Sequence, residues 1–245
     1  MSPSRVSTTQ LTLGLFPPPE ADFADFLGAG NALAQARLEA WATGAAPWCM
    51  GLWGAPGSGK SHLLQASIRR ADALGRRAMY LPLRDMRAHG PVLLEGLEHI
   101  AALALDDIDA VLGDAQWAEG LFALHERCQA AGGHWVFAAS APPAALTVAL
   151  RDLESRLSAA LIFQLQGLDD TDKLALIRQH AAARGLDLAE GVAAFLIRRL
   201  PRGTHQLVAA LAQLDAASLR AGRALTIPFV REVLGLEVVP PAGSD

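Results

Sequence analysis

Short apolar segments alternate with longer amphipathic segments over the first two thirds of the chain. The short segments carry little charge, as is typical of strands buried on both faces of a parallel sheet. The longer segments repeat their apolar residues at the spacing of one helix face. The predicted strands are residues 49–53, 77–83, 100–107, 135–140 and 161–165. The predicted helices are residues 31–42, 62–74, 91–97, 114–131 and 149–158.

This alternation predicts an α/β fold, in which right-handed crossovers build a parallel sheet with helices on both faces. From Asp170 the strand pattern stops, and only helical spacing remains. Four helices are predicted there, at residues 171–184, 189–200, 204–221 and 228–235. We therefore expect an N-terminal segment (1–21), an α/β domain (22–167), a small all-helical domain (168–236) and a C-terminal tail (237–245).

Composition and charge exclude several classes of protein. Hydrophobic residues make up 51% of the chain and aromatic residues only 6%, which suits a core of Leu, Ala, Val and Ile. The net charge of −4 argues against a protein that holds DNA by its own charge. Cys49 and Cys128 fit neither a disulfide framework nor a metal site, so we expect both to be buried apolar residues. No membrane span and no signal peptide are predicted, which favours a cytoplasmic protein without a membrane partner.

The segment Gly54-Ala55-Pro56-Gly57-Ser58-Gly59-Lys60-Ser61 matches the phosphate-binding loop G-x-x-x-x-G-K-S. A predicted strand precedes it and a predicted helix follows, so backbone N–H groups at the helix N-terminus could hold a triphosphate. A glycine-rich turn that merely contains Lys-Ser is the alternative. The predicted nucleotide contacts are Gly54, Gly57, Ser58, Gly59, Lys60, Ser61 and His62, with the Ser61 hydroxyl also on Mg²⁺.

Two carboxylates, Asp106 and Asp107, end a predicted strand, and Ser140 ends another. Ligands of open α/β sheets bind beyond the carboxyl ends of the strands. We therefore expect Asp106 to hold the Mg²⁺ and Asp107 to orient an attacking water. Ser140 would add a polar contact near the γ-phosphate. An exposed turn at the strand end is the alternative for the aspartate pair.

Together these motifs resemble the AAA+ ATPases, and in particular the DnaA branch of replication initiators. GAPGSGKSHLL, LALDD and FAAS stand in the family order, followed by ESRL around Arg156 and a helical C-terminal domain. Residues 26–34 are similar to the adenine-side motif of that branch, which carries Asn31. The resemblance covers roughly residues 22–236 and implies an AAA+ fold with a helical lid. It also implies ATP or ADP with Mg²⁺, Ser140 as sensor 1 and Arg156 as an arginine finger.

Two features resemble the Hda family of regulatory inactivators within that branch. The chain ends soon after the predicted lid, so we expect no DNA-binding helix-turn-helix domain and only weak or indirect DNA contact. Residues 10–15 look like a peptide that binds the DNA polymerase sliding clamp, through Gln10, Leu11, Leu13 and Leu15. An N-terminal strand that pairs with a sheet edge is the alternative for this peptide. The resemblance implies the clamp and DnaA as partners. Whether the chain also forms a homo-oligomer stays open.

His205 departs from the family pattern, because it stands where relatives carry the sensor 2 arginine. A histidine near neutral pH is only partly charged, so we expect weak intrinsic ATP hydrolysis and a role mainly as activator of a partner. An exposed helix residue without such a role is the alternative. Three other functions stay open: an ATPase of the helicase-loader type, a small-molecule kinase, and a clamp-binding adaptor with a structural nucleotide.

Overall fold

The structure is a computed structural model, which describes residues 21–45, 47–200 and 204–236. Its centre is a five-stranded sheet in the order β2-β3-β4-β1-β5, in which every neighbouring pair of strands is parallel. The predicted parallel sheet is therefore confirmed. The strands are β1 (Cys49–Trp53), β2 (Ala78–Pro82), β3 (Ala102–Asp106), β4 (His134–Ala139) and β5 (Leu161–Gln164).

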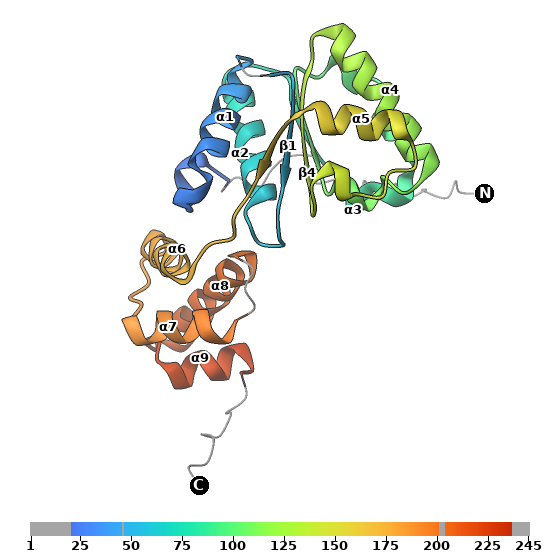
Figure 1. Cartoon of the computed structure of the whole chain (residues 1–245). Helices are drawn as coiled ribbons and strands as arrows, with labels where there is room; N and C mark the ends of the chain where they lie inside the picture. Colours follow the sequence, from blue (N-terminus) through green and yellow to red (C-terminus); the bar gives the residue numbers. More distant parts are fainter. Residues whose placement is uncertain (1–20, 46, 201–203, 237–245) are drawn as a thin grey trace, which may run out of the picture.

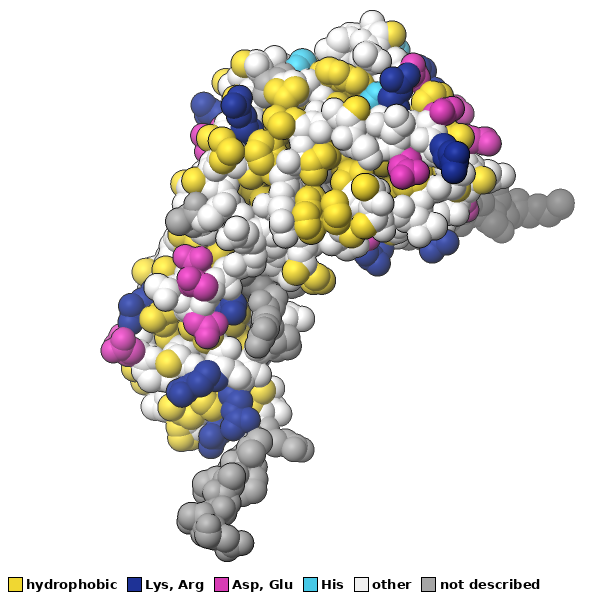
Figure 2. Space-filling model, in the orientation of Figure 1, with side chains coloured by type: hydrophobic (Ala, Val, Ile, Leu, Met, Phe, Trp, Pro, Cys, Tyr) yellow, Lys and Arg dark blue, Asp and Glu magenta, His cyan; other side chains and the backbone are white. Residues whose placement is uncertain are grey.

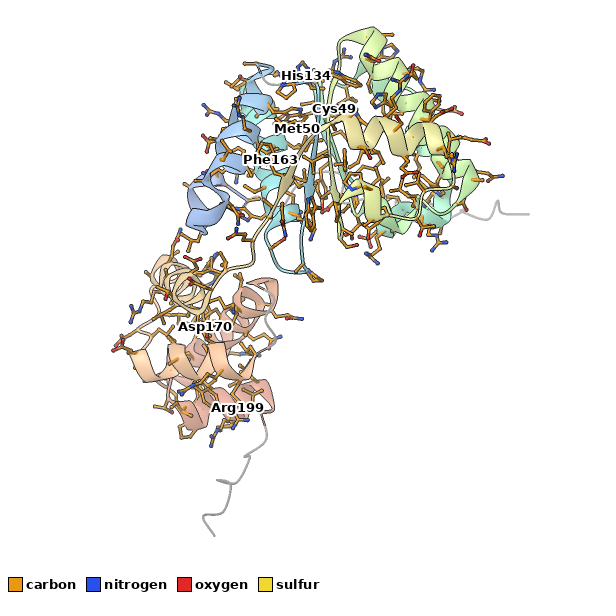
Figure 3. The ribbon with its side chains drawn as sticks, in the orientation of Figure 1. Cys49, Met50, His134, Phe163, Asp170 and Arg199 are labelled. Atoms are coloured by element: carbon orange, nitrogen blue, oxygen red, sulfur yellow. The ribbon has the colours of Figure 1, made fainter. Side chains whose placement is uncertain are left out.

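The inner strands are apolar apart from Asp106 at the end of β3 and His134 at the start of β4, because helices cover both faces of the sheet (Figure 1). Consecutive residues of a strand point to opposite faces, so Cys49 of β1 packs in one core and Met50 in the other (Figure 3). The helices of this domain are α1 (Ala32–Thr43), α2 (Lys60–Ala73), α3 (Leu83–Met86), α4 (Ala115–Ala131) and α5 (Arg151–Ala159). Helices α1 and α2 cover one face, and α4 and α5 cover the other.

Short 3₁₀ turns complete the domain, and one of them corrects a sequence prediction. The predicted helix at 91–97 is wrong, because the chain forms two 3₁₀ turns there, interrupted by an extended Glu95 and by Gly96 at φ 78°. A residue in the left-handed region breaks the helical hydrogen-bond series. The 3₁₀ turns are η1 (Phe23–Asp25), η2 (Ala29–Asn31), η3 (Arg87–His89), η4 (Pro91–Leu94), η5 (Leu97–His99), η6 (Ile108–Ala110) and η7 (Pro143–Ala145).

The helices after the sheet form a separate small domain with its own apolar core (Figure 1). They are α6 (Asp170–Ala183), α7 (Glu190–Arg199), α8 (Thr204–Ala221) and α9 (Ile227–Leu234). The carboxylate of Asp169 caps the N-terminus of α6, and the hydroxyl of Thr226 caps that of α9. The prediction of an all-helical domain after the sheet is confirmed.

Both cysteines are buried, as predicted. Burial raises the pKa of Cys49 to about 12 and that of Cys128 to about 11, so neither thiol is ionised near neutral pH. Within the described ranges, no helix combines the length and apolar character needed to span a membrane.

Candidate nucleotide site

The phosphate-binding loop joins the end of β1 to the start of α2, as the sequence predicts. Gly54 has φ 159°, and a Cβ there would lie 2.5 Å from the carbonyl oxygen of Leu165. Gly59 has φ 91°, and a Cβ there would lie 2.5 Å from a ring carbon of Phe26. Any larger residue at these two positions would force the loop away from its neighbours. The glycines therefore keep the loop open as a cradle of backbone N–H groups at the N-terminus of α2.

Lys60 begins α2 and folds back over the loop. Its ammonium donates hydrogen bonds to the carbonyl oxygens of Gly54 at 2.7 Å and Ala55 at 3.1 Å. Burial lowers the pKa of Lys60, while the charges of Asp106, Asp107 and Asp109 oppose that shift. The charged ammonium of Lys60 thus lies near three carboxylates and is hydrogen-bonded to two carbonyl oxygens. Oxygens of a bound phosphate could accept hydrogen bonds from the same ammonium.

A second polar group of the loop has no partner. The Ser58 hydroxyl is shielded from solvent, and it makes no hydrogen bond with the described residues. A buried polar atom without a partner is uncommon in folded proteins and often marks the place of a missing ligand. The loop therefore fits a phosphate group by its glycine cradle, by Lys60 and by Ser58.

Asp106 ends β3 and is almost entirely buried, with 3% of its surface exposed. One carboxylate oxygen accepts a hydrogen bond from the hydroxyl of Tyr80 at 2.7 Å, and the other from the N–H of Asp107 at 2.9 Å. Burial raises the pKa of Asp106, and hydrogen bonds from Ser61 and Tyr80 act in the opposite direction. Ser61 and Asp106, the two predicted metal residues, are thus brought together by the fold.

This pair of oxygens fits Mg²⁺, which usually takes one or two protein ligands and completes its shell with waters and phosphates. Among the described residues, no group of three or more His, Cys, Asp or Glu side chains could hold a metal ion. The protein side of such a site would therefore consist of the Ser61 hydroxyl and the Asp106 carboxylate.

Asp107 is the single non-glycine residue with positive φ in the described part of the chain, at φ 52° and ψ 45°. Its carboxylate forms an ion pair with Arg84, at 2.8 Å between Oδ2 and Nε, and Arg84 donates a hydrogen bond there. Asp107 thus lies beside the metal pair, but its carboxylate is already engaged. Sequence reasoning missed Arg84 and Tyr80, because both reach the site from β2 and α3 rather than from a motif.

Ser140 follows β4, as predicted, and donates a hydrogen bond to Asp109 at 2.7 Å. Asp109 is a third carboxylate near Lys60 that the sequence analysis did not single out. The second oxygen of Asp109 is shielded from solvent and has no hydrogen bond among the described residues. Ser140 is therefore held at the strand end by an aspartate three residues after Asp106.

The segment before α1 packs on the start of α2. The ring of Phe26 lies 6.0 Å from that of His62, and His62 Nε2 lies 2.8 Å from the carbonyl oxygen of Asp22. Asn31 is buried, and its amide exchanges two hydrogen bonds of 2.9 Å with the backbone of Gln166. Asn31 precedes α1 without capping it by a side-chain hydrogen bond. Its amide instead fixes the connection between β5 and the helical domain, while its contact with a nucleotide stays a prediction.

Arg156 lies on the face of the sheet opposite to α2, within α5. Its guanidinium pairs with Glu126 of α4, at 3.2 Å between Nε and Oε1. The side chain of Arg156 is 49% exposed, so a neighbouring molecule can reach it. The structure thus separates Arg156 from this chain's own phosphate loop.

Other predicted residues cannot be placed. Gln10, Leu11, Leu13 and Leu15 lie outside the described residues. His205 lies in α8, but its side chain is not among those described.

The fold is similar to that of the replication initiator DnaA and of RuvB. Domain III of the replication initiation protein DnaA from Thermotoga maritima superimposes with a TM-score of 0.77 and 21% identity, covering 91% of this chain and 99% of that one. AMPPCP-bound DnaA from Aquifex aeolicus superimposes with a TM-score of 0.71 and 21% identity, covering 84% and 68%. RuvB from Thermotoga maritima gives a TM-score of 0.64 at 16% identity, covering 90% and 72%.

The helical domain shows a second similarity. Residues 170–234 match the family model "Hda, lid domain". Residues 170–234 thus match an Hda-type lid that follows a DnaA-like fold, in agreement with the resemblance drawn from the motifs.

Proposed function

We propose that this chain is a nucleotide-binding regulator of replication initiation, which stimulates the hydrolysis of ATP bound to DnaA. One observation carries the proposal: an Hda-type lid at residues 170–234 follows a DnaA-like fold that keeps a complete phosphate loop. An inactivator of DnaA would have to contact DnaA in the way that the AAA+ domains of DnaA contact one another. A chain with the same fold can form such a contact.

The chain's own nucleotide would be ATP or ADP with Mg²⁺, as the AMPPCP in relatives suggests. The loop N–H groups and Lys60 would bind its phosphates, and Ser61 with Asp106 would hold the metal. A bound triphosphate supplies the phosphoanhydride bond that an ATPase hydrolyses. Asp107 would have to leave Arg84, or share it, before it could orient a water. Together with His205, this supports weak intrinsic hydrolysis and a mainly structural role for the nucleotide.

Arg156 would act on ATP held by DnaA rather than on this chain's nucleotide. Its place on α5, on the sheet face opposite to α2 and exposed to a neighbour, supports that role. A guanidinium stabilises the charge that develops on a transferring phosphoryl group, and such arginine fingers contribute about 10³–10⁵ in rate in GTPases.

The sliding clamp would bring the two proteins together. In the proposed contact, Leu11, Leu13 and Leu15 lie along one side of an extended peptide and enter an apolar groove, while Gln10 fixes the register. Each buried leucine contributes about 1.5–3 kcal/mol before ordering costs, which is enough for a weak anchor. Figure 2 shows basic and acidic side chains together on the visible face of the lid, which suits a protein partner better than a DNA backbone.

The test is the conversion of DnaA-bound radiolabelled ATP to ADP, with clamp loaded on DNA. Wild-type protein should accelerate conversion, and Arg156→Ala should abolish the acceleration. Arg70→Ala removes the same charge from an exposed position at the end of α2 and serves as the matched control. The double variant Gln10→Ala with Leu13→Ala should lose clamp binding and stimulation together. Undiminished stimulation by folded Arg156→Ala would refute the role of Arg156.

A further inference from the structure

The ion pair between Arg156 and Glu126 connects α5 to α4. We propose that Glu126 is a positioning residue, which holds the guanidinium of Arg156 in the orientation that a neighbouring nucleotide meets. This inference rests on the proposed function of Arg156 and extends it to a residue on a different helix.

The backbone that carries Arg156 is fixed by its neighbours in α5. Leu153 and Leu157 are both fully buried in the core beneath the helix. The Cα of Arg156 therefore has a defined place, but its long side chain keeps several rotatable bonds. A second anchor near the guanidinium is needed to decide where its charge lies, and Glu126 is that anchor.

The atom used for this contact leaves the phosphate-binding atoms of the arginine available. Glu126 Oε1 faces Nε, and neither terminal amino group of Arg156 makes a hydrogen bond with the described part of the chain. These two groups form the planar fork that matches two oxygens of a phosphate. A carboxylate on Nε thus directs the fork outward without occupying it.

Glu126 has no competing positive charge on its own helix. Burial lowers the pKa of His125, whose ring packs against the rings of Trp48 at 4.7 Å and Trp135 at 5.7 Å. His125 is therefore neutral near pH 7. Arg127 pairs with Glu98 instead, at 3.1 Å.

The Glu126 oxygen that faces Arg156 is shielded from solvent, and it accepts no hydrogen bond of good geometry within the described ranges. The side chains of Arg156 and Glu126 are 49% and 43% exposed, so this is an electrostatic contact at the surface, which sets the direction of the guanidinium more than it adds stability.

The experiment compares Glu126→Ala and Glu126→Gln with Glu119→Ala in the assay of DnaA-bound ATP. Glu119 is exposed on α4 seven residues before Glu126. Glu119→Ala therefore removes the same charge from the same side of the helix, about 10 Å away. Glu126→Ala should lower the maximal stimulated rate about 3- to 30-fold, because a misplaced catalytic group loses rate steeply. The concentration for half-maximal stimulation should stay unchanged. Glu126→Gln should keep part of the rate, and Glu119→Ala should match wild type.

One further measurement separates positioning from a general structural role. The Nε–H signal of Arg156 in ¹⁵N-arginine spectra, assigned from its absence in Arg156→Lys, should move in Glu126→Ala and not in Glu119→Ala.

The outcomes distinguish this inference from the proposed function. If Arg156→Ala abolishes stimulation while Glu126→Ala equals Glu119→Ala, the positioning role of Glu126 is overturned and the role of Arg156 stands. A change confined to the half-maximal concentration overturns it as well. If Arg156→Ala stimulates normally, the proposed function fails and the inference fails with it.

Discussion

The hydrogen bond from Tyr80 to Asp106 can be removed by a change of one atom. Tyr80→Phe keeps the buried ring and deletes only the hydroxyl that donates to Asp106 Oδ2 at 2.7 Å. Hydrogen bonds to charged groups stabilise folded proteins by about 1.5–3 kcal/mol, so we expect a loss of that size at pH 7. For a chain of this length, each kcal/mol lowers the melting temperature by about 2–4 °C.

The pH dependence gives this prediction its sign. Burial raises the pKa of Asp106 above its value in the unfolded chain, so the folded state binds the proton more readily. Stability from Asp106 is then present below the unfolded pKa and is lost as the pH rises through the folded pKa. The hydrogen bond from Tyr80 lowers the pKa of Asp106 in the folded state, so this pKa should be higher in Tyr80→Phe. The stability difference between Tyr80→Phe and wild type should therefore be small in acid and should grow toward neutral pH.

The assay is urea unfolding of both proteins from about pH 4 to about pH 8, followed by tryptophan fluorescence. In an Asp106→Asn background, the effect of Tyr80→Phe should shrink, because no ionised oxygen is left unsatisfied. A difference that is independent of pH, or that persists unchanged in that background, would refute the reasoning. Tyr80 is the chain's single tyrosine, so its ionisation can be followed by absorbance. It should begin only well above pH 10, because burial and the nearby Asp106 raise its pKa.

Three more changes test other parts of the site. Lys60→Ala should abolish nucleotide binding in calorimetry, because the glycine cradle cannot replace its charge; affinity within a few-fold of wild type would contradict this. Asn31→Ala should cost about 1–3 kcal/mol, because it removes two part-buried hydrogen bonds to the backbone of Gln166, and an unchanged melting temperature would argue against it. His205→Arg should raise intrinsic ATP turnover, measured without DnaA, and no change would mean that the phosphates do not contact this position.

The parts of the fold that the sequence predicted are those encoded by contiguous residues. Each strand is a short apolar run because both of its faces are buried, and that pattern needs no knowledge of the partner strands. The phosphate loop is contiguous too, so Gly54 to Ser61 could be assigned from the motif alone. The prediction of a helix at 91–97 is wrong because its leucines have helical spacing, while the extended Glu95 and the left-handed Gly96 separate two 3₁₀ turns.

The contacts that complete the site join distant residues, and no local pattern encodes them. Tyr80 pairs with Ala104 across β2 and β3, which places it on the same side of the sheet as Asp106, two residues further on. That register follows from the assembled sheet. Arg84 reaches Asp107 because α3 begins directly after β2, and Glu126 meets Arg156 because α4 packs on α5. Such pairs depend on tertiary packing, which one sequence does not specify.

The contact between Gly54 and Leu165 has a thermodynamic consequence. Leu165 follows β5, donates its N–H to Trp53 at 2.7 Å, and lies so close to Gly54 that no side chain fits between them. The first residue of the phosphate loop therefore touches the strand end from which the chain runs to the lid. A partner that binds the lid and displaces this segment must alter nucleotide affinity, and by linkage the nucleotide must alter the partner's affinity by the same factor. The surface of the helical domain can thus be coupled to the bound nucleotide through the contact between Gly54 and Leu165.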